Sequence, residues 1–231
     1  MRATTLLSGV LTAASCFFVF PATAQFENYV FGPDEYPPLP TVGFKFNHFS
    51  IIVGDLAASM HFYTTVLGMR ELFTYHATDY FKLAYLGYPS GGHNGTGYQS
   101  PLEMLRDKNN MQGLVEFLYY APNATDPSPK LPEASSKKTN TFSHMGLIVP
   151  DIKVARQRFL EYNVSIIADI GEVNPDPVKI HRALIAYGTG LLPEGSDKVV
   201  EEIMKSLGNS GQEAMIIEDP DGNIIEVQPQ W

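Results

Sequence analysis

The sequence predicts an α+β fold built from two βαβββ modules, with helices outside curved mixed sheets. The main observation is an internal repeat, in which a histidine is followed seven positions later by an aspartate and then by a helix-like segment. A second observation is that each repeat closes with a strand that holds one glutamate inside an apolar run. These residues are His48 and Glu116 in the first repeat, and His144 and Glu226 in the second. A duplicated unit of this kind predicts two sheets that close on a shared cavity.

The first 24 residues are predicted to be a signal peptide that lies outside the fold. Arg2 supplies a positive start, residues 6–20 form an apolar run, and Ala24 ends a small-residue cleavage site. The run is too short and wrongly flanked for a membrane span. We therefore expect a secreted protein that begins near Gln25.

Cysteine content and net charge exclude several kinds of site and partner for the mature chain. The only cysteine, Cys16, lies inside the predicted signal peptide, which excludes thiol nucleophiles, cysteine metal sites and disulfides. The net charge of −9, without a cluster of Lys or Arg, argues against nucleic acid or anionic lipid as a partner and favours a small molecule. Three Asn-x-Ser/Thr triplets are candidates for N-glycosylation in a eukaryotic secretory pathway: Asn94, Asn123 and Asn163.

The first module is predicted to span residues 44–121, after a proline- and aromatic-rich extended arm at residues 25–43. Alternating apolar residues indicate a strand at 44–53. Asp55 is expected to cap a helix at 56–67, which Gly68 ends. The remaining predicted elements are strands at 70–75, 80–87 and 114–120 and a loop rich in Gly, Asn and Ser at 89–100.

The second module is predicted to span residues 142–231, after a linker rich in Pro, Ser and Lys at 122–141. It repeats the plan of the first: Asp151 caps a helix, and a DPDGN turn at 219–223 joins the last two strands. An insertion at 171–211, with a helix-like segment at 197–207, is either a flap over the site or a surface decoration. The predicted elements are strands at 142–149, 164–169, 213–218 and 224–228 and a helix at 152–162.

The two histidines and two glutamates form the candidate metal site. Carboxylates buried in an apolar cavity without a cation would each cost several kcal/mol, or would protonate. A divalent metal removes that cost, and imidazole and carboxylate are suitable ligands for it. Strand alternation predicts that these pocket residues share the cavity: Phe46, Ser50, Ile52, Leu118, Tyr120, Phe142 and Gln228. The other histidines are expected at the surface or the cavity rim: His61, His76, His93 and His181.

Four segments resemble the vicinal oxygen chelate superfamily, and within it glyoxalase I, the lactoylglutathione lyases. They are residues 53–56 (VGDL), 62–69 (FYTTVLGM), 142–146 (FSHMG) and 219–226 (DPDGNIIE). The resemblance covers about residues 46 to 228, apart from inserted segments such as residues 171–211. It implies paired βαβββ modules and a single metal ion held by His48, Glu116, His144 and Glu226.

The resemblance also implies a reaction. In the family, the metal keeps open positions for water or for two adjacent substrate oxygens, and a carboxylate ligand moves a proton between neighbouring carbons through an enediolate. Glu226 would be the main base, with Glu116 able to act from the opposite face. A histidine at the first ligand position resembles the bacterial nickel or cobalt type, and zinc is also compatible.

Three departures put glutathione in doubt as a co-substrate. An arginine that contacts glutathione four residues after the first ligand is Ile52 here, and a second arginine, four before the third ligand, is Asn140. An asparagine four residues after the second ligand is Tyr120. The fold and the metal therefore carry over better than the hemithioacetal substrate.

Three functions remain open at the level of sequence. The first is a metal-dependent lyase or isomerase of the glyoxalase I type. The second is an iron-dependent dioxygenase, or a hydrolase or rearrangement enzyme acting on a hydrophobic natural product. The third is a non-catalytic protein that binds a small molecule. Both modules lie in one chain, so a cavity can close within the monomer, and family analogy also allows a homodimer.

Overall fold

The computed structural model describes residues 30–36, 38–91, 97–121, 142–171, 195–196, 198–199 and 213–230. The chain divides into two compact units, residues 1–44 and 45–231. In the first unit, the described part of the predicted arm contains a short 3-10 helix, η2 (Leu39–Thr41). The predicted signal peptide, the linker at 122–141 and nearly all of the 171–211 insertion lie outside the described residues, as do Asn94 and Asn123.

The described part of the chain contains no helix with the length and apolarity that crossing a membrane requires.

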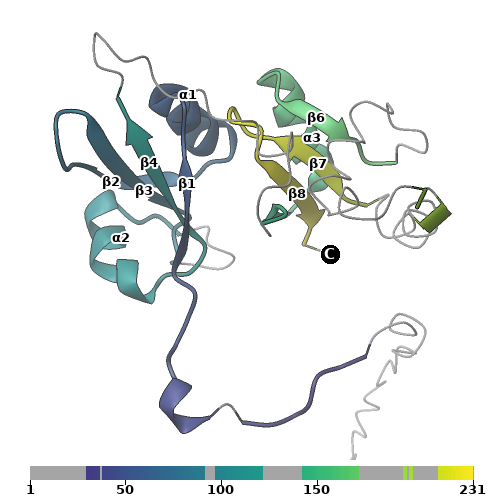
Figure 1. The fold of residues 1–231 in the computed structure, drawn as a ribbon. Coiled ribbons are helices and arrows are strands. Elements are labelled where there is room, and N and C mark those ends of the chain that lie inside the picture. Colours follow the sequence, from purple (N-terminus) through teal and green to yellow (C-terminus); the bar gives the residue numbers. More distant parts are fainter. Residues whose placement is uncertain are drawn as a thin grey trace, which may run out of the picture. The chain divides into compact units, whose positions relative to one another are not determined.

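The first module forms one four-stranded mixed sheet, coloured blue to teal in Figure 1. The strand order is β1-β4-β3-β2, in which β1 and β4 run parallel and the other neighbours run antiparallel. A parallel neighbour needs a crossover, and the helical segment after β1 begins it. The strands are β1 (His48–Ile52), β2 (Arg70–His76), β3 (Phe81–Gly87) and β4 (Leu114–Tyr120).

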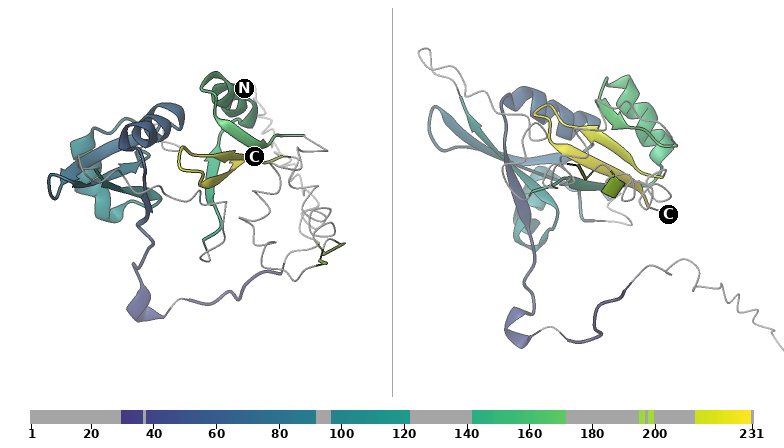
Figure 2. Two further views of the ribbon diagram at one scale, coloured as in Figure 1. Left: turned by 45° about the horizontal axis from the view of Figure 1, so that its top comes forward. Right: turned by 45° about the vertical axis from the view of Figure 1, so that its right-hand side comes forward.

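The second module repeats this topology in the green to yellow half of the chain (Figure 2). Its strand order is β5-β8-β7-β6, with β5 and β8 parallel. The predicted fold class, two βαβββ modules with mixed sheets, is therefore confirmed. The strands are β5 (Met145–Val149), β6 (Ser165–Ala168), β7 (Met215–Glu218) and β8 (Ile224–Pro229).

The crossover helices begin at the two predicted caps. The Asp55 carboxylate accepts a hydrogen bond from the Ala58 N–H at the start of α1 (Leu56–Met60), and Asp151 caps α3 (Ile152–Glu161) in the same way. The first helix differs from the prediction in its second half, where α1 continues into a π-helix, η3 (His61–Val66). It ends before Gly68, whose φ of 78° suits a residue without a Cβ.

One helix was not predicted from the sequence. α2 (Pro101–Asp107) and the 3-10 helix η5 (Lys108–Asn110) lie between β3 and β4. A capping box starts α2, because the Ser100 hydroxyl accepts from the Glu103 N–H while the Glu103 carboxylate accepts from the Ser100 N–H. Met104 of α2 is fully buried against Tyr85 and Leu114 on one face of the first sheet.

The opposite face of the first sheet belongs to a core that both modules share. Apolar side chains on the helix-facing sides of both sheets pack in one cluster with the crossover helices. Because side chains alternate along a strand, the residues between these core positions lie on the other face of each sheet. The fully or nearly fully buried members are Val53, Phe62, Tyr63, Val66, Met69, Ala84, Leu86, Val115, Phe117, Met145, Phe159, Met215, Ile217, Ile225 and Val227.

Polar contacts from the β7–β8 turn tie the two modules together at this core. The Tyr63 hydroxyl donates to the Asp219 carboxylate at 2.9 Å. The Asp221 carboxylate accepts from the Gly54 N–H at 2.9 Å and from the Ser59 hydroxyl at 3.1 Å. Burial raises the pKa of Asp219, although its hydrogen bonds oppose that rise. Burial and the adjacent Asp219 charge also raise the pKa of Tyr63, so its hydroxyl stays protonated and donates.

We expect Tyr63→Phe to lower the free energy of unfolding by about 1 to 3 kcal/mol, because a buried carboxylate loses one of its donors while the ring packing is kept. Urea denaturation, followed by circular dichroism, measures the loss. Tyr119→Phe is the matched control, since the Tyr119 side chain packs on the same core and its hydroxyl has no hydrogen-bond partner among the described residues. Equal stability of the two variants would contradict a role for the Tyr63–Asp219 bond in joining the modules.

Candidate functional site

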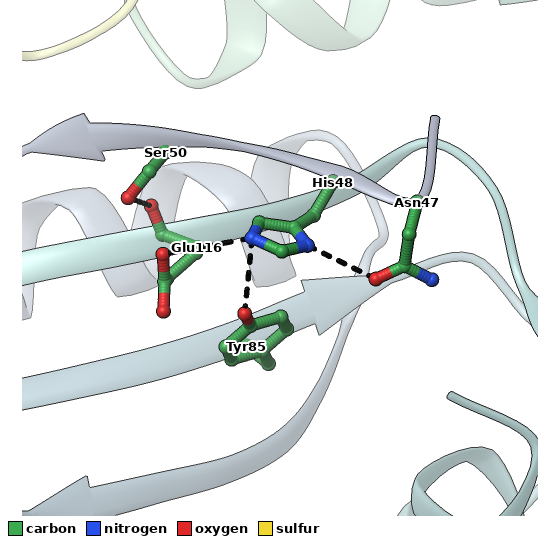
Figure 3. A network of polar contacts seen from close by, with 5 residues as sticks. All are labelled: Asn47, His48, Ser50, Tyr85 and Glu116. Atoms are coloured by element: carbon green, nitrogen blue, oxygen red, sulfur yellow. Dashed lines mark hydrogen bonds and ion pairs between the residues drawn. The ribbon is translucent and has the colours of Figure 1, made fainter. Parts of the chain in front are cut away.

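His48 and Glu116 lie on the face of the first sheet that points away from the shared core. The register pairs Ser50 of β1 with Glu116 of β4, and Tyr85 of β3 also faces Glu116, so all three side chains share this face. His48 lies two residues before Ser50 on the same strand. Figure 3 shows its imidazole turned toward Glu116, with 3.8 Å between Nε2 and the carboxylate Oε2. We call this face of the first sheet, with His48, Ser50, Tyr85 and Glu116, the first ligand face.

Asn47 determines which nitrogen of His48 is available. Its amide Nδ2 donates to the carbonyls of Lys108 and Met111, at 2.7 and 2.9 Å. The remaining amide atom, Oδ1, therefore faces His48 Nδ1 at 3.0 Å (Figure 3). Since this oxygen only accepts, Nδ1 carries the hydrogen of the neutral ring, and Nε2 then has the lone pair. The lone pair is directed at the region that Glu116 also faces.

Tyr85 completes the first ligand face. Its hydroxyl lies 3.2 Å from His48 Nε2, and the two rings meet edge to face with centroids 5.1 Å apart (Figure 3). Burial, followed by the Glu116 charge and a hydrogen bond with Glu116, raises the pKa of Tyr85 to about 12. The hydroxyl is therefore protonated at neutral pH, and its acceptors are the Glu116 carboxylate and, when Nε2 is unprotonated, the His48 lone pair. A ligand that takes this lone pair frees the hydroxyl for another acceptor.

The second module repeats the pair, with a different neighbour. His144 Nε2 lies 3.5 Å from Glu226 Oε2, and the Ser143 hydroxyl lies 2.8 Å from His144 Nδ1, in the position of Asn47. The Gln228 amide donates to Glu226 Oε2 at 3.1 Å. Ile216 faces Glu226 across the sheet, where the first module has Tyr85. We call this face of the second sheet the second ligand face.

Each pair fits half of a metal site. Donors bound to one divalent ion at about 2.0 to 2.2 Å lie roughly 3 to 3.5 Å apart, close to the two observed spacings. The hydrogen bonds of Asn47 and Ser143 to the far ring nitrogens are the contacts that metal-ligating histidines ordinarily make. Among the described residues, no group of three or more His, Cys, Asp or Glu gathers around one point. The structure thus brings each histidine to the glutamate of its own module and keeps the two pairs separate.

Most predicted pocket residues lie on the ligand faces. Register and alternation place Ser50, Ile52, Leu118 and Tyr120 on the first face, and Gln228 on the second. The other two predicted pocket residues precede the strands that carry the histidines. Phe46, before β1, is 98% exposed, and Phe142, before β5, is 46% exposed.

The remaining predicted positions are at the surface or outside the described residues. His61 and His76 are exposed, as expected. Asn163 is also exposed, in a turn with a φ of 54°. His93, Asn140 and His181 lie outside the described residues.

Sequence reasoning missed Asn47, Ser143 and Tyr85. Asn47 and Ser143 could have been found from the sequence, because each is a short polar residue directly before a histidine of the repeat. Tyr85 had no such signal, since its place beside His48 depends on the register of β3 against β4.

A family model matches residues 45–181, more than half of the chain: the Glyoxalase/Bleomycin resistance protein/Dioxygenase superfamily. No curated protein sequence matches the chain.

Solved structures resemble the chain at low identity. A trypanothione-dependent glyoxalase I from Leishmania major is 19% identical, with a TM-score of 0.46, over 81% of this chain and 88% of its own. A V278E variant of glyoxalase I from Zea mays is 16% identical, with a TM-score of 0.42, over 79% of this chain and 43% of its own. TnmS3, an antibiotic-binding protein from a Streptomyces species, is 14% identical, with a TM-score of 0.39, over 80% and 95%.

We expect His48 of the metal-free protein to carry its hydrogen on Nδ1, because Asn47 Oδ1 accepts there and Tyr85 donates to Nε2. Long-range proton–nitrogen correlation spectra of the histidine-labelled protein at pH 8 distinguish the two tautomers. Asn47→Leu should shift His48 toward the Nε2–H form, whereas Ser143→Ala should leave the His48 signals in place. A wild-type protein with the hydrogen on Nε2 of His48 would contradict the assignment.

Proposed function

Because the chain belongs to the glyoxalase/bleomycin resistance protein/dioxygenase superfamily, we propose that it is a secreted metal-dependent lyase or isomerase of the glyoxalase I type. It moves a proton between adjacent oxygen-bearing carbons of a small molecule. The observation that carries the proposal is the repeated pair, a histidine Nε2 with a glutamate carboxylate at 3.8 Å and at 3.5 Å. A buried structural histidine would not need this arrangement twice.

His48, Glu116, His144 and Glu226 would hold one nickel, cobalt or zinc ion. When bound, such an ion supplies positive charge that stabilises an oxyanion on the substrate. The chain's own contribution is to present lone pairs: Asn47 holds the hydrogen of the neutral His48 ring on Nδ1, so that Nε2 is the free nitrogen, and the partly exposed carboxylates of Glu116 and Glu226 are accessible to a ligand. Four neutral or anionic donors are a suitable set for these metals.

A second copy of the chain brings the two pairs together. The helix-facing sides of both sheets are already buried in one core, and the ligand faces lie outside it, with α2 packed on the end of the first face that holds Tyr85 and Leu114. Each ligand face is bordered by exposed apolar side chains, Ile52 and Tyr120 on the first and Ile148 on the second. In a two-fold dimer, the first ligand face of one protomer meets the second ligand face of its partner, and two equivalent sites result.

Glu226 is the proposed base for proton transfer. Its carboxylate already accepts a hydrogen bond from the Gln228 amide, which fixes its orientation on the second ligand face. Glu116 acts from the opposite side of the substrate. Glutathione is not required, because the exposed apolar Ile52 and the phenol of Tyr120 lie where the resembling enzymes have polar contacts to it.

Secretion and glycosylation belong to the same proposal. The signal-like residues 1–24 carry the prediction of export, and the exposed turn at Asn163 gives a glycosyltransferase access to that sequon.

Metal analysis of mixed variants tests both the ligands and the dimer. The wild-type chain should bind one ion per chain, and His48→Ala and His144→Ala should each lose it. A heterodimer purified from differently tagged His48→Ala and His144→Ala chains should regain one ion per dimer. The reason is that one of its two sites combines the intact first face of one chain with the intact second face of the other.

The outcomes separate the alternatives. A heterodimer without metal, from chains that bind metal as wild type, would contradict a site shared between chains and favour closure within one chain. Wild-type protein that binds no metal would contradict the metal-dependent reaction as a whole.

Proton exchange tests catalysis without a known substrate. The metal-loaded protein should exchange the carbon-bound protons next to the hydroxyl of 2-hydroxyacetophenone for deuterium in heavy water, as followed by NMR. Glu226→Gln should slow the exchange about 10²- to 10⁴-fold per bound metal ion, because the amide cannot take up the proton. Binding of the ketone without exchange would instead indicate a binding protein, and oxygen consumption would indicate a dioxygenase.

A further inference from the structure

Lys108 places a positive charge beside the first ligand face. It lies in η5, directly after α2, and its Nζ is 4.5 Å from the centroid of the Tyr85 ring. The residue is only half-exposed, yet none of the ion pairs or hydrogen bonds within the described part of the chain involves its ammonium group. The Tyr85 ring stabilises the Lys108 ammonium only weakly, and the three N–H donors of the ammonium have no acceptor among the described residues.

The position of Lys108 is fixed relative to His48 by two contacts. Its carbonyl accepts from Asn47, the residue that also holds the His48 ring. Phe73 stacks on the Tyr85 ring with centroids 5.2 Å apart, which leaves the other face of that ring for the ammonium. The Tyr85 hydroxyl meets His48 Nε2 at the rim of the same ring. His48 and Lys108 thus approach the same tyrosine, His48 at its hydroxyl and Lys108 at a face of its ring.

Among the described residues, the second ligand face has no counterpart for this charge. Ile216 occupies the place of Tyr85, so the second module offers no aromatic ring there to support a cation. The chain as a whole has a net charge of −9, so Lys108 does not belong to a generally basic surface. Its charge is a local feature of one end of the first ligand face.

We propose that Lys108 binds a carboxylate of the substrate. This inference rests on the proposed function and specifies the substrate class: a small molecule whose two adjacent oxygens reach the His48–Glu116 pair, and which carries a separate carboxylate about one aromatic ring away. The carboxylate gives the half-buried ammonium a charge-assisted hydrogen bond. The Tyr85 ring, which contacts His48 through its hydroxyl and Lys108 through its face, sets the separation of the two groups.

Two catechols that differ only in charge test the inference. Both 3,4-dihydroxybenzoate and 3,4-dihydroxybenzamide present adjacent oxygens, but only the first has a carboxylate. In calorimetric titrations of the metal-loaded wild-type protein, the benzoate should bind about tenfold more tightly than the amide. Lys108→Met should remove this preference and leave the affinity for the amide unchanged, whereas Lys108→Arg should retain it.

Lys82→Met is the matched control, because Lys82 is also half-exposed and lies on the same strand as Tyr85 with its side chain on the opposite face. It should keep the preference for the benzoate. A preference that survives in Lys108→Met, or a wild-type protein that binds the two probes equally or binds neither, would overturn the inference. If metal content is normal in that case, only the carboxylate subsite fails. If the wild type holds no metal, the proposed function fails with it.

Discussion

The shared apolar core is the constraint on which the rest of this structure depends. Each sheet gives its helix-facing side to that core, and strand alternation then leaves every second residue on the other side. His48 and Glu116 lie on the same face of the first sheet, and His144 and Glu226 lie on the same face of the second. Strand alternation alone therefore places both polar pairs outside the core. Bonds from Tyr63 to Asp219 and from Gly54 to Asp221 fix the modules at that core. The same packing leaves the ligand faces outside the core, where the proposed substrate and second protomer would bind.

The two repeats have diverged at positions that explain their different roles. Tyr63 and Phe159 occupy the same place in the crossover helices, and only the tyrosine has a hydroxyl to bond the other module. Tyr85 and Ile216 occupy the same place in the sheets, and only the tyrosine contacts a histidine of the site. The first module thus provides the Tyr63 hydroxyl that bonds the second module and the Tyr85 hydroxyl that adds a polar group to the first ligand face. The second module provides an apolar surface around its pair.

The sequence was sufficient for the elements whose signals are local. β4 has the predicted bounds, and both helices begin at the predicted aspartates, because alternation and capping depend on neighbouring residues. It was insufficient where the structure depends on register or on unusual backbone. The π-helical turn of η3 follows from no local pattern in the sequence. α2 is different, because its Ser100–Glu103 capping box is a local signal that the predicted loop at 89–100 and strand at 114–120 did not include. The sequence predicts that all four side chains meet in one cavity, whereas the structure pairs each histidine with the glutamate of its own module. Whether the pairs meet depends on packing that no sequence pattern encodes.

The central claim is that two imidazoles and two carboxylates, one pair from each ligand face, surround one metal ion. X-ray absorption spectroscopy of the metal-loaded mature protein tests it most directly, since it counts imidazole ligands and measures bond lengths without a known substrate. The account predicts two imidazole nitrogens with carboxylate or water oxygens, all at about 2.0 to 2.2 Å. A spectrum with one imidazole or none would contradict it, because the two repeats would then not contribute to a common site.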